Sequence, residues 1–420
     1  MGWFKRFVVL AGACGILAGV GTSIASGKGT LTTLVSFSES QQIDVSSPPI
    51  FDSAGNLYTT GAYAPGSAGS IIELPAGSST PSIIPFDFTD GMEPLSPLIV
   101  DSSGNVYGVT PAGGASFQYG QSDGVGTIFE IPHGSNTIQD LVSFSGSNGS
   151  YPDGPLLLSG GSFYGTTAFG GQFGDGTIFK FTPGGAGLTT LASFDSSSGN
   201  FAVSNLTMDL SGDLFGFTQS GGANGTGTVF ELAAGSDSIT ALAPFGPPLP
   251  GAENPTPKGD LLIDSQGNLY GVDQFGGSAG FGEIYELAKG SNAITTLASF
   301  DDSNGAVPNY LIMDAAGNFF GTAHAGALGY GAIFELAAGS DTISDIFRFD
   351  GADGGAPNGL FADSAGNLYG TSYGDSSYTS GTIFELSGFG FVVPEPSAIS
   401  LLLALAFPAL LIRPGPAWRL

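Results

Sequence analysis

One short segment that recurs along this chain limits its possible folds more than any other feature. DSAGNLYGT, which begins at Asp363 and ends at Thr371, has near-copies at five earlier points, beginning at Asp52, Asp101, Asp209, Asp264 and Asp314. Counted by its glycine, this segment, here called the Asp box, occurs seven times, at Gly55, Gly104, Gly161, Gly212, Gly267, Gly317 and Gly366. Successive glycines are 49 to 57 residues apart. A period near 50 residues is typical of propeller blades.

Each repeat contains four strand-like runs. In the sixth repeat they are ITTLASF at 294–300, YLIMD at 310–314, NFFGT at 318–322 and GAIFELA at 331–337. All are short, aromatic or β-branched, and bounded by Gly, Ser, Asn or Asp. One small four-stranded sheet cannot bury both faces alone, so it must stack on neighbours. The sequence therefore predicts an all-β fold over residues 30–390, a seven-bladed β-propeller of four-stranded antiparallel blades.

The order of the runs indicates how the ring closes. In each repeat the PxxxLxxD run is expected to be innermost, and the TTLxSF run comes before it in the chain. The first TTLxSF run, at residues 31–36, precedes the first complete repeat, and none follows the last GTIFEL run at 381–386. We therefore expect residues 31–36 to form the outer strand of the last blade, so that the N-terminal strand closes the ring.

Composition excludes two classes of protein. Although 70 of the 420 residues are Gly, 41% of the chain is hydrophobic and 33 positions are Phe, which is too apolar for a disordered linker. The chain has 36 acidic and 9 basic residues, a net charge of −27, and its few Lys and Arg are scattered. Nucleic acid is excluded as a partner because its binding requires clustered basic residues. Such acidic surfaces repel one another, and we expect a monomer without a cofactor.

Residues 1–25 are typical of a secretory signal peptide. Lys5 and Arg6 precede the apolar run FVVLAGACGILAGVG, and small residues before Ala25 suit cleavage there. The only cysteine, Cys14, lies inside this segment, so the mature protein would have no disulfide. Lipidation of Cys14 is an alternative, although Ala11 stands where a lipoprotein box has Leu.

The segment 393–420 resembles the PEP-CTERM sorting signal. It has VPEPS, then the apolar run AISLLLALAFPALLI, then Arg413 and Arg419, which are separated where that family has a tight Arg cluster. The resemblance implies export by a Gram-negative bacterium to its surface or surroundings and processing by an exosortase, with membrane contact only through this segment beforehand. An ordinary anchor is the alternative, but about 15 residues span only about 22 Å as a helix, against ~30 Å of hydrocarbon. The motif that the resemblance assigns comprises Pro394, Glu395 and Pro396.

The Asp box has two possible roles. Asp can accept a hydrogen bond from the backbone two residues on, and Gly can take a positive φ, which together are hairpin-turn chemistry. A calcium loop would need several carboxylate or carbonyl oxygens at short spacing. Each box offers one carboxylate, apart from Asp213 as a second in the fourth copy, and the third copy, LSGGSFYG at 158–165, has none. We favour the turn and expect no metal site.

A second acid recurs in the GTIFEL run. Within a strand, Glu points away from its Phe and Leu neighbours, so a solvated face or a protected sheet edge explains it. A ring of carboxylates around a channel is the alternative, but this run is not the expected innermost strand. The residues at this position are Glu73, Glu130, Glu231, Glu286, Glu335 and Glu385, with Lys180 in the third repeat.

The tandem pattern GNLYGT…GG…GTIFEL…LxxF resembles the GloVer repeat family over about residues 30–390. It departs from that pattern at Thr59, where Gly is usual, and in the third repeat, which lacks the Asp. The resemblance implies a surface-located bacterial repeat protein, and it supplies no reaction and no catalytic residues.

Few residues are suited to catalysis. The only histidines are His133, expected toward the outside, and His324, expected near one mouth of the channel. Residues that break the repeat are candidates for a grafted site. They are Asp153, Asp175, Asp273 and Glu283, of which Asp273 stands where several repeats have Thr. Loop aromatics suited to sugar or peptide binding are Phe117, Tyr119, Phe169, Phe173, Phe275 and Phe281.

Two functions remain open. The first and favoured one is a non-enzymatic module that binds extracellular polysaccharide or a protein partner through one propeller face. The alternative is a polysaccharide hydrolase or lyase that uses carboxylates at the propeller mouth. Asp273 and His324 are the candidate mouth residues, and the sequence places no carboxyl pair at a catalytic separation.

Overall fold

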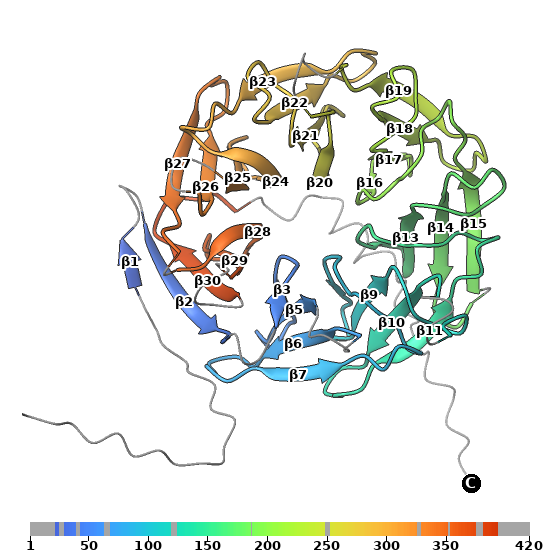
Figure 1. The fold of residues 1–420 in the computed structure, drawn as a ribbon, viewed down its shortest axis with the longest axis horizontal. Coiled ribbons are helices and arrows are strands. Elements are labelled where there is room, and N and C mark those ends of the chain that lie inside the picture. Colours follow the sequence, from blue (N-terminus) through green and yellow to red (C-terminus); the bar gives the residue numbers. More distant parts are fainter. Residues whose placement is uncertain are drawn as a thin grey trace, which may run out of the picture.

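The computed structural model describes residues 22–24, 29–38, 43–62, 68–118, 124–185, 187–247, 253–325, 329–351, 353–374 and 381–393. These residues form seven antiparallel sheets around a common axis, with no helix in those ranges (Figure 1). The predicted seven-bladed β-propeller is confirmed. The sorting motif and the predicted signal peptide up to Gly21 lie outside the described residues, as does Tyr119. No described helix has the length and apolar character needed to cross a bilayer.

Each blade begins with its innermost strand and ends with its outermost strand. Blade 1 consists of β3 (Asp44–Val45) and β4 (Ile50–Phe51), β5 (Leu57–Ala62), β6 (Ser70–Leu74) and β7 (Ser82–Pro85). Blade 2 consists of β8 (Ile99–Val100), β9 (Val106–Thr110), β10 (Thr127–Ile131) and β11 (Gln139–Ser143). Blade 3 consists of β12 (Leu157–Ser159), β13 (Ser162–Thr167), β14 (Thr177–Thr182) and β15 (Gly187–Ser193).

The next three blades repeat this order. Blade 4 consists of β16 (Thr207–Met208), β17 (Leu214–Phe217), β18 (Thr228–Leu232) and β19 (Thr240–Pro244). Blade 5 consists of β20 (Pro257–Ile263), β21 (Leu269–Asp273), β22 (Glu283–Leu287) and β23 (Thr295–Ser299). Blade 6 consists of β24 (Ala306–Met313), β25 (Phe319–Ala325), β26 (Ala332–Leu336) and β27 (Ile343–Arg348).

Blade 7 is completed by the N-terminal strand, as predicted. It consists of β28 (Gly355–Ala362), β29 (Leu368–Tyr373), β30 (Thr382–Ser387) and then β2 (Thr30–Ser36), with β1 (Thr22–Ile24) beyond. The pairing of β2 with β30 runs from Thr30 opposite Ser387 to Ser36 opposite Thr382. Figure 1 shows β2 along the outer edge of this blade. The ring is therefore closed by hydrogen bonds between strands from the two ends of the sequence.

The hydrophobic core is divided among the junctions between blades. Seven buried clusters fill the seven junctions, each with residues from two neighbouring blades. At six junctions an aromatic ring at the end of an outer strand meets an aromatic ring of the next blade's third strand, edge to face, at 4.9–5.4 Å. Phe194 and Phe230 are one such pair, 4.9 Å apart. Sheet stacking therefore buries the apolar faces, as the repeat required.

The glycine of the LYGT run makes room for the ring of this third-strand aromatic residue. In blade 3, Gly165 is opposite Phe179, and a Cβ on Gly165 would lie 2.5 Å from the tip of that ring. In blade 1 the equivalent residue is Thr59, and its cross-strand partner is Ile72, which has no ring. The departure from Gly at Thr59 therefore accompanies the loss of the aromatic partner.

The ring has two different faces. The turn between the first and second strands of a blade holds the Asp box, and the turn between the third and fourth strands lies beside it, since Ala76 N–H donates to Asn56 Oδ1 at 3.0 Å. We call this side the Asp-box face. The opposite side, here the loop face, carries the loops between second and third strands and the connections from one blade to the next.

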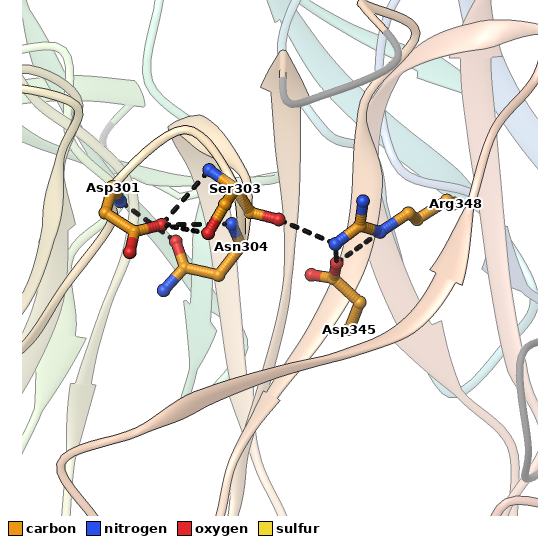
Figure 2. Close-up of polar contacts among 5 residues, drawn as sticks. All are labelled: Asp301, Ser303, Asn304, Asp345 and Arg348. Carbon is orange, nitrogen blue, oxygen red and sulfur yellow. Dashed lines mark hydrogen bonds and ion pairs between the residues drawn. The ribbon is translucent and has the colours of Figure 1, made fainter.

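Figure 2 shows one of the loop-face connections, from blade 5 to blade 6. Asp301 Oδ1 accepts hydrogen bonds from the Ser303 hydroxyl at 2.7 Å and from Asn304 N–H at 3.2 Å, which closes a tight turn. The Arg348 guanidinium, at the end of β27, donates to the Ser303 carbonyl at 2.6 Å and forms an ion pair with Asp345. The hydrogen bond to Ser303 ties the connection to the outer strand of blade 6. The ion pair, the one found among the described residues, lies within that strand and holds the guanidinium in place.

The last described residues cross the Asp-box face as a strap. Ala315 N–H donates to the Val392 carbonyl at 2.9 Å, beside the Asp box of blade 6. The Phe391 ring lies 5.2 Å from that of Phe320. Since Thr30 is paired with Ser387, β2 begins and β30 ends on this same face.

Candidate functional site

A polar cavity lies on the propeller axis at the loop face. Its volume is about 230 Å³. Its wall includes residues at or just before the inner strands of all seven blades, namely Ser46, Ser96, Asp153, Val203, Lys258, Asn309 and Asn358. It also includes residues at the ends of second strands, among them His324 on β25 and Tyr373 on β29. Second strands end at the loop face, so the cavity occupies that end of the channel.

Hydrogen bonds between blades hold this wall in place. Asn309 Nδ2 donates to the Asn358 carbonyl at 2.8 Å, and Asn358 Nδ2 donates to the Val45 carbonyl at 2.7 Å. The Ser96 hydroxyl donates to the backbone carbonyl of Asp153. Blades 6, 7 and 1 are thereby joined at the axis by short polar side chains, and so are blades 2 and 3. The wall is therefore preorganised by contacts between neighbouring blades.

Two buried polar atoms of the wall have no hydrogen-bond partner within the described chain. They are Asn309 Oδ1 and His324 Nε2. Asn309 is 4% exposed, and its amide nitrogen is already bonded across the blade junction. A buried acceptor without a donor costs about 1–3 kcal/mol. These atoms are available to a group that enters the cavity.

The cavity also contains three charged side chains. Burial raises the pKa of Asp153 to about 6, against the lowering effect of Lys258, and burial alone raises the pKa of Asp260 to about 6. Both residues are half-buried because they face the open cavity, while protein surrounds them on the other sides. The Lys258 ammonium makes no ion pair within 4.0 Å among the described residues.

The remaining titratable groups of the cavity are uncharged near neutral pH. Burial, with the nearby Lys258 ammonium, lowers the pKa of His324 to about 4, so its imidazole is neutral above that pH. Burial raises the pKa of Tyr310 and of Tyr373, so both stay protonated. At pH 7 the cavity therefore has two carboxylates and one ammonium, with neutral polar groups between them.

The charges arise from changes to the inner strands of two blades. Where blades 6 and 7 have PNYL and PNGL, blade 3 has PDGPL and blade 5 has PKGDL. The register of β20 against β21 shifts between Lys258 and Leu262, which is the segment that contains these charges. Sequence reasoning singled out Asp153 but missed Lys258 and Asp260, and the two charged residues within the PxxxL run of blade 5 were the available signal.

The structure separates the two predicted mouth residues. His324 lines the cavity, whereas Asp273 is absent from its wall and is 1% exposed at the end of β21. Asp273 Oδ1 accepts N–H bonds from Thr256, Phe275 and Gly276 at 2.7–3.1 Å, so it holds a loop.

The other repeat-breaking acids also lie away from the cavity wall. Glu283 is opposite Asp273 in the pairing of β22 with β21, and burial raises the pKa of both carboxyls. Asp175 lies on the loop between β13 and β14. His133 is exposed on the Asp-box face, where its N–H donates to Asn105 Oδ1 at 2.9 Å.

The Asp boxes form the same turn around the opposite face. In each of the six boxes with Asp, its Oδ1 accepts the N–H two residues on and the N–H four residues on, at 2.8–3.0 Å. In the last box, Asp363 Oδ1 accepts from Ala365 N–H at 2.8 Å and from Asn367 N–H at 2.9 Å. All seven box glycines have a positive φ, from 73° to 87°. The aspartates bonded in this way are Asp52, Asp101, Asp209, Asp264, Asp314 and Asp363.

These turns leave the box carboxylates little freedom to bind anything else. In the last box Asp363 Oδ2 is also engaged, since it accepts from Asn367 Nδ2 at 2.9 Å and from the Tyr369 hydroxyl at 3.4 Å. Among the described residues, no three His, Cys, Asp or Glu side chains gather as metal ligands would. The carboxylates are therefore used within the turns.

The Glu of the GTIFEL run is bonded within its blade. The Tyr hydroxyl of the second strand donates to this Glu in blades 1, 2 and 5, for example Tyr107 to Glu130 at 3.0 Å. In blade 3 the Lys180 ammonium instead lies 5.4 Å from the centre of the Tyr164 ring. None of these residues lines the cavity.

Aromatic residues are exposed on the loop face beside the cavity. Phe169 and Phe173 are 47% and 56% exposed, and Phe281 is 40% exposed. Phe169 lies 6.0 Å from Tyr151 and 5.4 Å from Phe201, both edge to face. Tyr151 is two residues from Asp153 in the cavity wall. An apolar surface therefore adjoins the polar cavity on this side.

Fold and site together define a seven-bladed propeller with a polar axial cavity, and the sequence places the chain in a family. Two matches to the Gloeobacter/Verrucomicrobia repeat, at residues 116–256 and 247–392, cover more than half of the chain. The chain belongs to this repeat family. No curated protein matches it.

Solved structures share the fold at low sequence identity. The extracellular domain of a putative one-component system from B. thetaiotaomicron matches 86% of this chain with a TM-score of 0.54 and 12% identity. The chain spans only 40% of that protein's length. An oligogalacturonate lyase in complex with manganese matches 91% of this chain and 97% of its own, with a TM-score of 0.52 and 8% identity. These likenesses concern the fold alone.

Proposed function

We propose that this protein is an exported, surface-displayed binding module whose axial cavity takes a sugar unit of an extracellular polysaccharide. The observation that carries the proposal is the set of cavity groups without bonding partners, Asn309 Oδ1 and His324 Nε2 among them. Binding sites typically combine such convergent polar groups with apolar walls. A cavity of about 230 Å³ gives room for several waters or one monosaccharide.

The surface beside the cavity supports a sugar ligand. Phe169 and Tyr151 are aromatic residues next to the cavity wall, and aromatic rings with polar neighbours suit the apolar face of a pyranose. Among the described residues of the Asp-box face, the box carboxylates are used within turns and are not available to a ligand. Ligand binding is therefore assigned to the loop face. A protein segment is the second kind of ligand that this face suits.

The proposal includes the route to the cell surface. It retains the PEP-CTERM resemblance at Pro394, Glu395 and Pro396, processing by an exosortase, and a signal peptide over residues 1–25. An extracellular domain among the proteins with the same fold agrees with export. We expect the processed chain outside the cell, and we expect the Glu395→Ala variant to stay unprocessed and bound to the membrane. Immunoblots of cell and culture fractions test this part.

Glycan-array binding by the purified full chain tests the ligand assignment. We expect binding of polysaccharide fragments that His324→Ala weakens and that His133→Ala leaves unchanged. His133 is the matched control because it is the chain's other histidine and is exposed on the opposite face. Equal loss in both variants, or binding to neither glycan nor peptide, contradicts the assignment.

A hydrolase or lyase is the second candidate function. Asp153 and Asp260 both act electrostatically on Tyr310, and both have a pKa near 6, which suits proton transfer close to neutral pH. Assays for new reducing ends and for unsaturated products, run beside the binding experiment, separate the two functions. Product growth that Asp260→Asn abolishes identifies an enzyme, and binding without product identifies a binding module.

A further inference from the structure

The axial cavity contains three acceptor groups without a hydrogen-bond partner among the described residues. The carboxylates of Asp153 and Asp260 have no hydrogen-bond partner in the described part of the chain, and neither has Asn309 Oδ1. The Lys258 ammonium is the one cation in the cavity wall. A ligand that fills this space must therefore bring donors.

The Lys258 ammonium compensates the charge of Asp153 but not that of Asp260. Lys258 lowers the pKa of Asp153 and also that of His324, so its ammonium lies near those two groups. No charged group offsets the effect of burial on Asp260. Buried carboxylates are normally paired or bound to a cation. Asp260 is therefore the uncompensated charge of the cavity.

A second, independent observation identifies the same part of the wall. Asn309 is 4% exposed, and its Oδ1 has no partner, while its Nδ2 is fixed on the Asn358 carbonyl at 2.8 Å. This fixed orientation leaves the acceptor end of the amide unused. Gly259, which precedes Asp260, lies against Asn309, because a Cβ on Gly259 would overlap the Asn309 carbonyl oxygen. The free amide oxygen and the uncompensated carboxylate therefore belong to neighbouring strands of the same cavity wall.

We propose that the cavity binds an amino sugar, with the protonated primary amine taken by the Asp260 carboxylate and Asn309 Oδ1. This inference rests on the proposed function and names the class of sugar. An ammonium offers three donors and one positive charge, which matches acceptors that include an unpaired carboxylate. The ring hydroxyls face the remaining polar wall, including Lys258 and His324.

The charge of the whole molecule agrees with a cationic ligand. A net charge of −27 gives a negative potential around the protein, which attracts cations and repels anionic sugars such as uronates. The cavity itself has two carboxylates against one ammonium at neutral pH. An acidic sugar would therefore be opposed both outside and inside the cavity.

Three monosaccharides built on the same pyranose ring, one with an amine, one with an acetylated amine and one with a carboxylate, test the inference. Isothermal titration of the full chain at about pH 7 compares glucosamine, N-acetylglucosamine and glucuronate as probes. We expect glucosamine to bind at least about tenfold more tightly than N-acetylglucosamine, since a charge-assisted hydrogen bond is lost on acetylation. At about pH 5, where Asp153 and Asp260 take up protons, this preference should shrink. His324 stays neutral over that interval.

Variants test whether Asp260 causes the preference for glucosamine over N-acetylglucosamine. Asp260→Asn should remove at least about tenfold of the glucosamine affinity and change that for N-acetylglucosamine little. Asp153→Asn should reduce the affinity for glucosamine less, because Lys258 already compensates this carboxylate. Asp237→Asn, which removes the same charge from an exposed turn, is the control. Thermal melts confirm that each variant is folded.

The possible outcomes separate the inference from the proposed function. If the three probes bind equally, or glucuronate binds best, the amino-sugar inference is wrong and the saccharide site stands. If no saccharide binds at either pH, the proposed function fails and the inference fails with it. Tight glucosamine binding that survives Asp260→Asn also overturns the inference, because the amine would then lie elsewhere.

Discussion

At the scale of single residues, the repeat is explained by pairs of positions. The glycine of LYGT and the aromatic residue of GTIF are opposite each other, and Gly165 with Phe179 shows how closely they fit. Blade 1 replaces both, with Thr59 opposite Ile72. The sequence pattern therefore reflects one packing requirement distributed over two strands.

A double-mutant cycle at Gly165 and Phe179 tests this pairing. Gly165→Ala should destabilise the protein by about 1–3 kcal/mol, because the new methyl group overlaps the ring. In the Phe179→Ile background the same change should cost much less, as blade 1 indicates. Urea unfolding of the four proteins measures the coupling, and additive effects would contradict the proposed fit.

The Asp260 carboxyl makes the free energy of unfolding depend on pH, and the direction of its pKa shift gives the sign. Its pKa is about 6 in the folded protein and 3.8 in the reference state, so the folded state binds more protons between these values. The resulting destabilisation is absent below pH 3.8, grows as pH rises, and is complete above about 6. It amounts to at most about 3 kcal/mol.

Replacing Asp260 by Asn should therefore stabilise the protein at pH 7 and have little effect near pH 4. Urea midpoints at the two pH values measure the difference. Asp237→Asn, which removes the same charge from an exposed turn, is the control. A destabilised Asp260→Asn variant at pH 7 would show that this carboxylate has a partner.

At the scale of elements, the closing strand is the feature that sequence order predicted best. One TTLxSF run stood before the first repeat and none followed the last, so only pairing of β2 with β30 gave every blade four strands. The site was less predictable. Asp273 breaks the repeat but holds a loop, whereas Asp260 lines the cavity from β20, whose register against β21 shifts. Periodicity does not show which of the two carboxylates faces the axis.

Deletion of residues 30–37 should open the ring. It removes Leu31, Val35 and Phe37, which are at most 1% exposed, and at about 1.5–3 kcal/mol each their loss costs at least about 5 kcal/mol. Thermal unfolding should show a large decrease. Shortening the exposed loop at residues 172–174 is the matched control, and a similar decrease there would contradict the closure argument.

At the scale of the whole molecule, the charge distribution sets solution behaviour. A net charge of −27 destabilises the compact state through self-repulsion and opposes association of copies. The described residues contain one ion pair, Arg348 with Asp345, to offset this. The free energy of unfolding should therefore depend on ionic strength.

Raising the salt concentration from about 10 mM to 150 mM shortens the screening length from about 30 Å to 8 Å. We expect the melting temperature to rise and the protein to stay monomeric in analytical ultracentrifugation. Unchanged melting would show that the acidic residues are too far apart to repel, and a dimer at either salt concentration would contradict the expected monomer.

The strap on the Asp-box face determines which face of the propeller lies nearest the C-terminal segment. Val392 is bonded to Ala315 on that face, so the described chain ends on the side opposite the axial cavity. If the C-terminal segment holds the protein at the membrane before processing, as the sorting-signal resemblance implies, the Asp boxes are the part of the ring nearest the membrane. The axial opening then lies on the far face, where a polysaccharide can reach it.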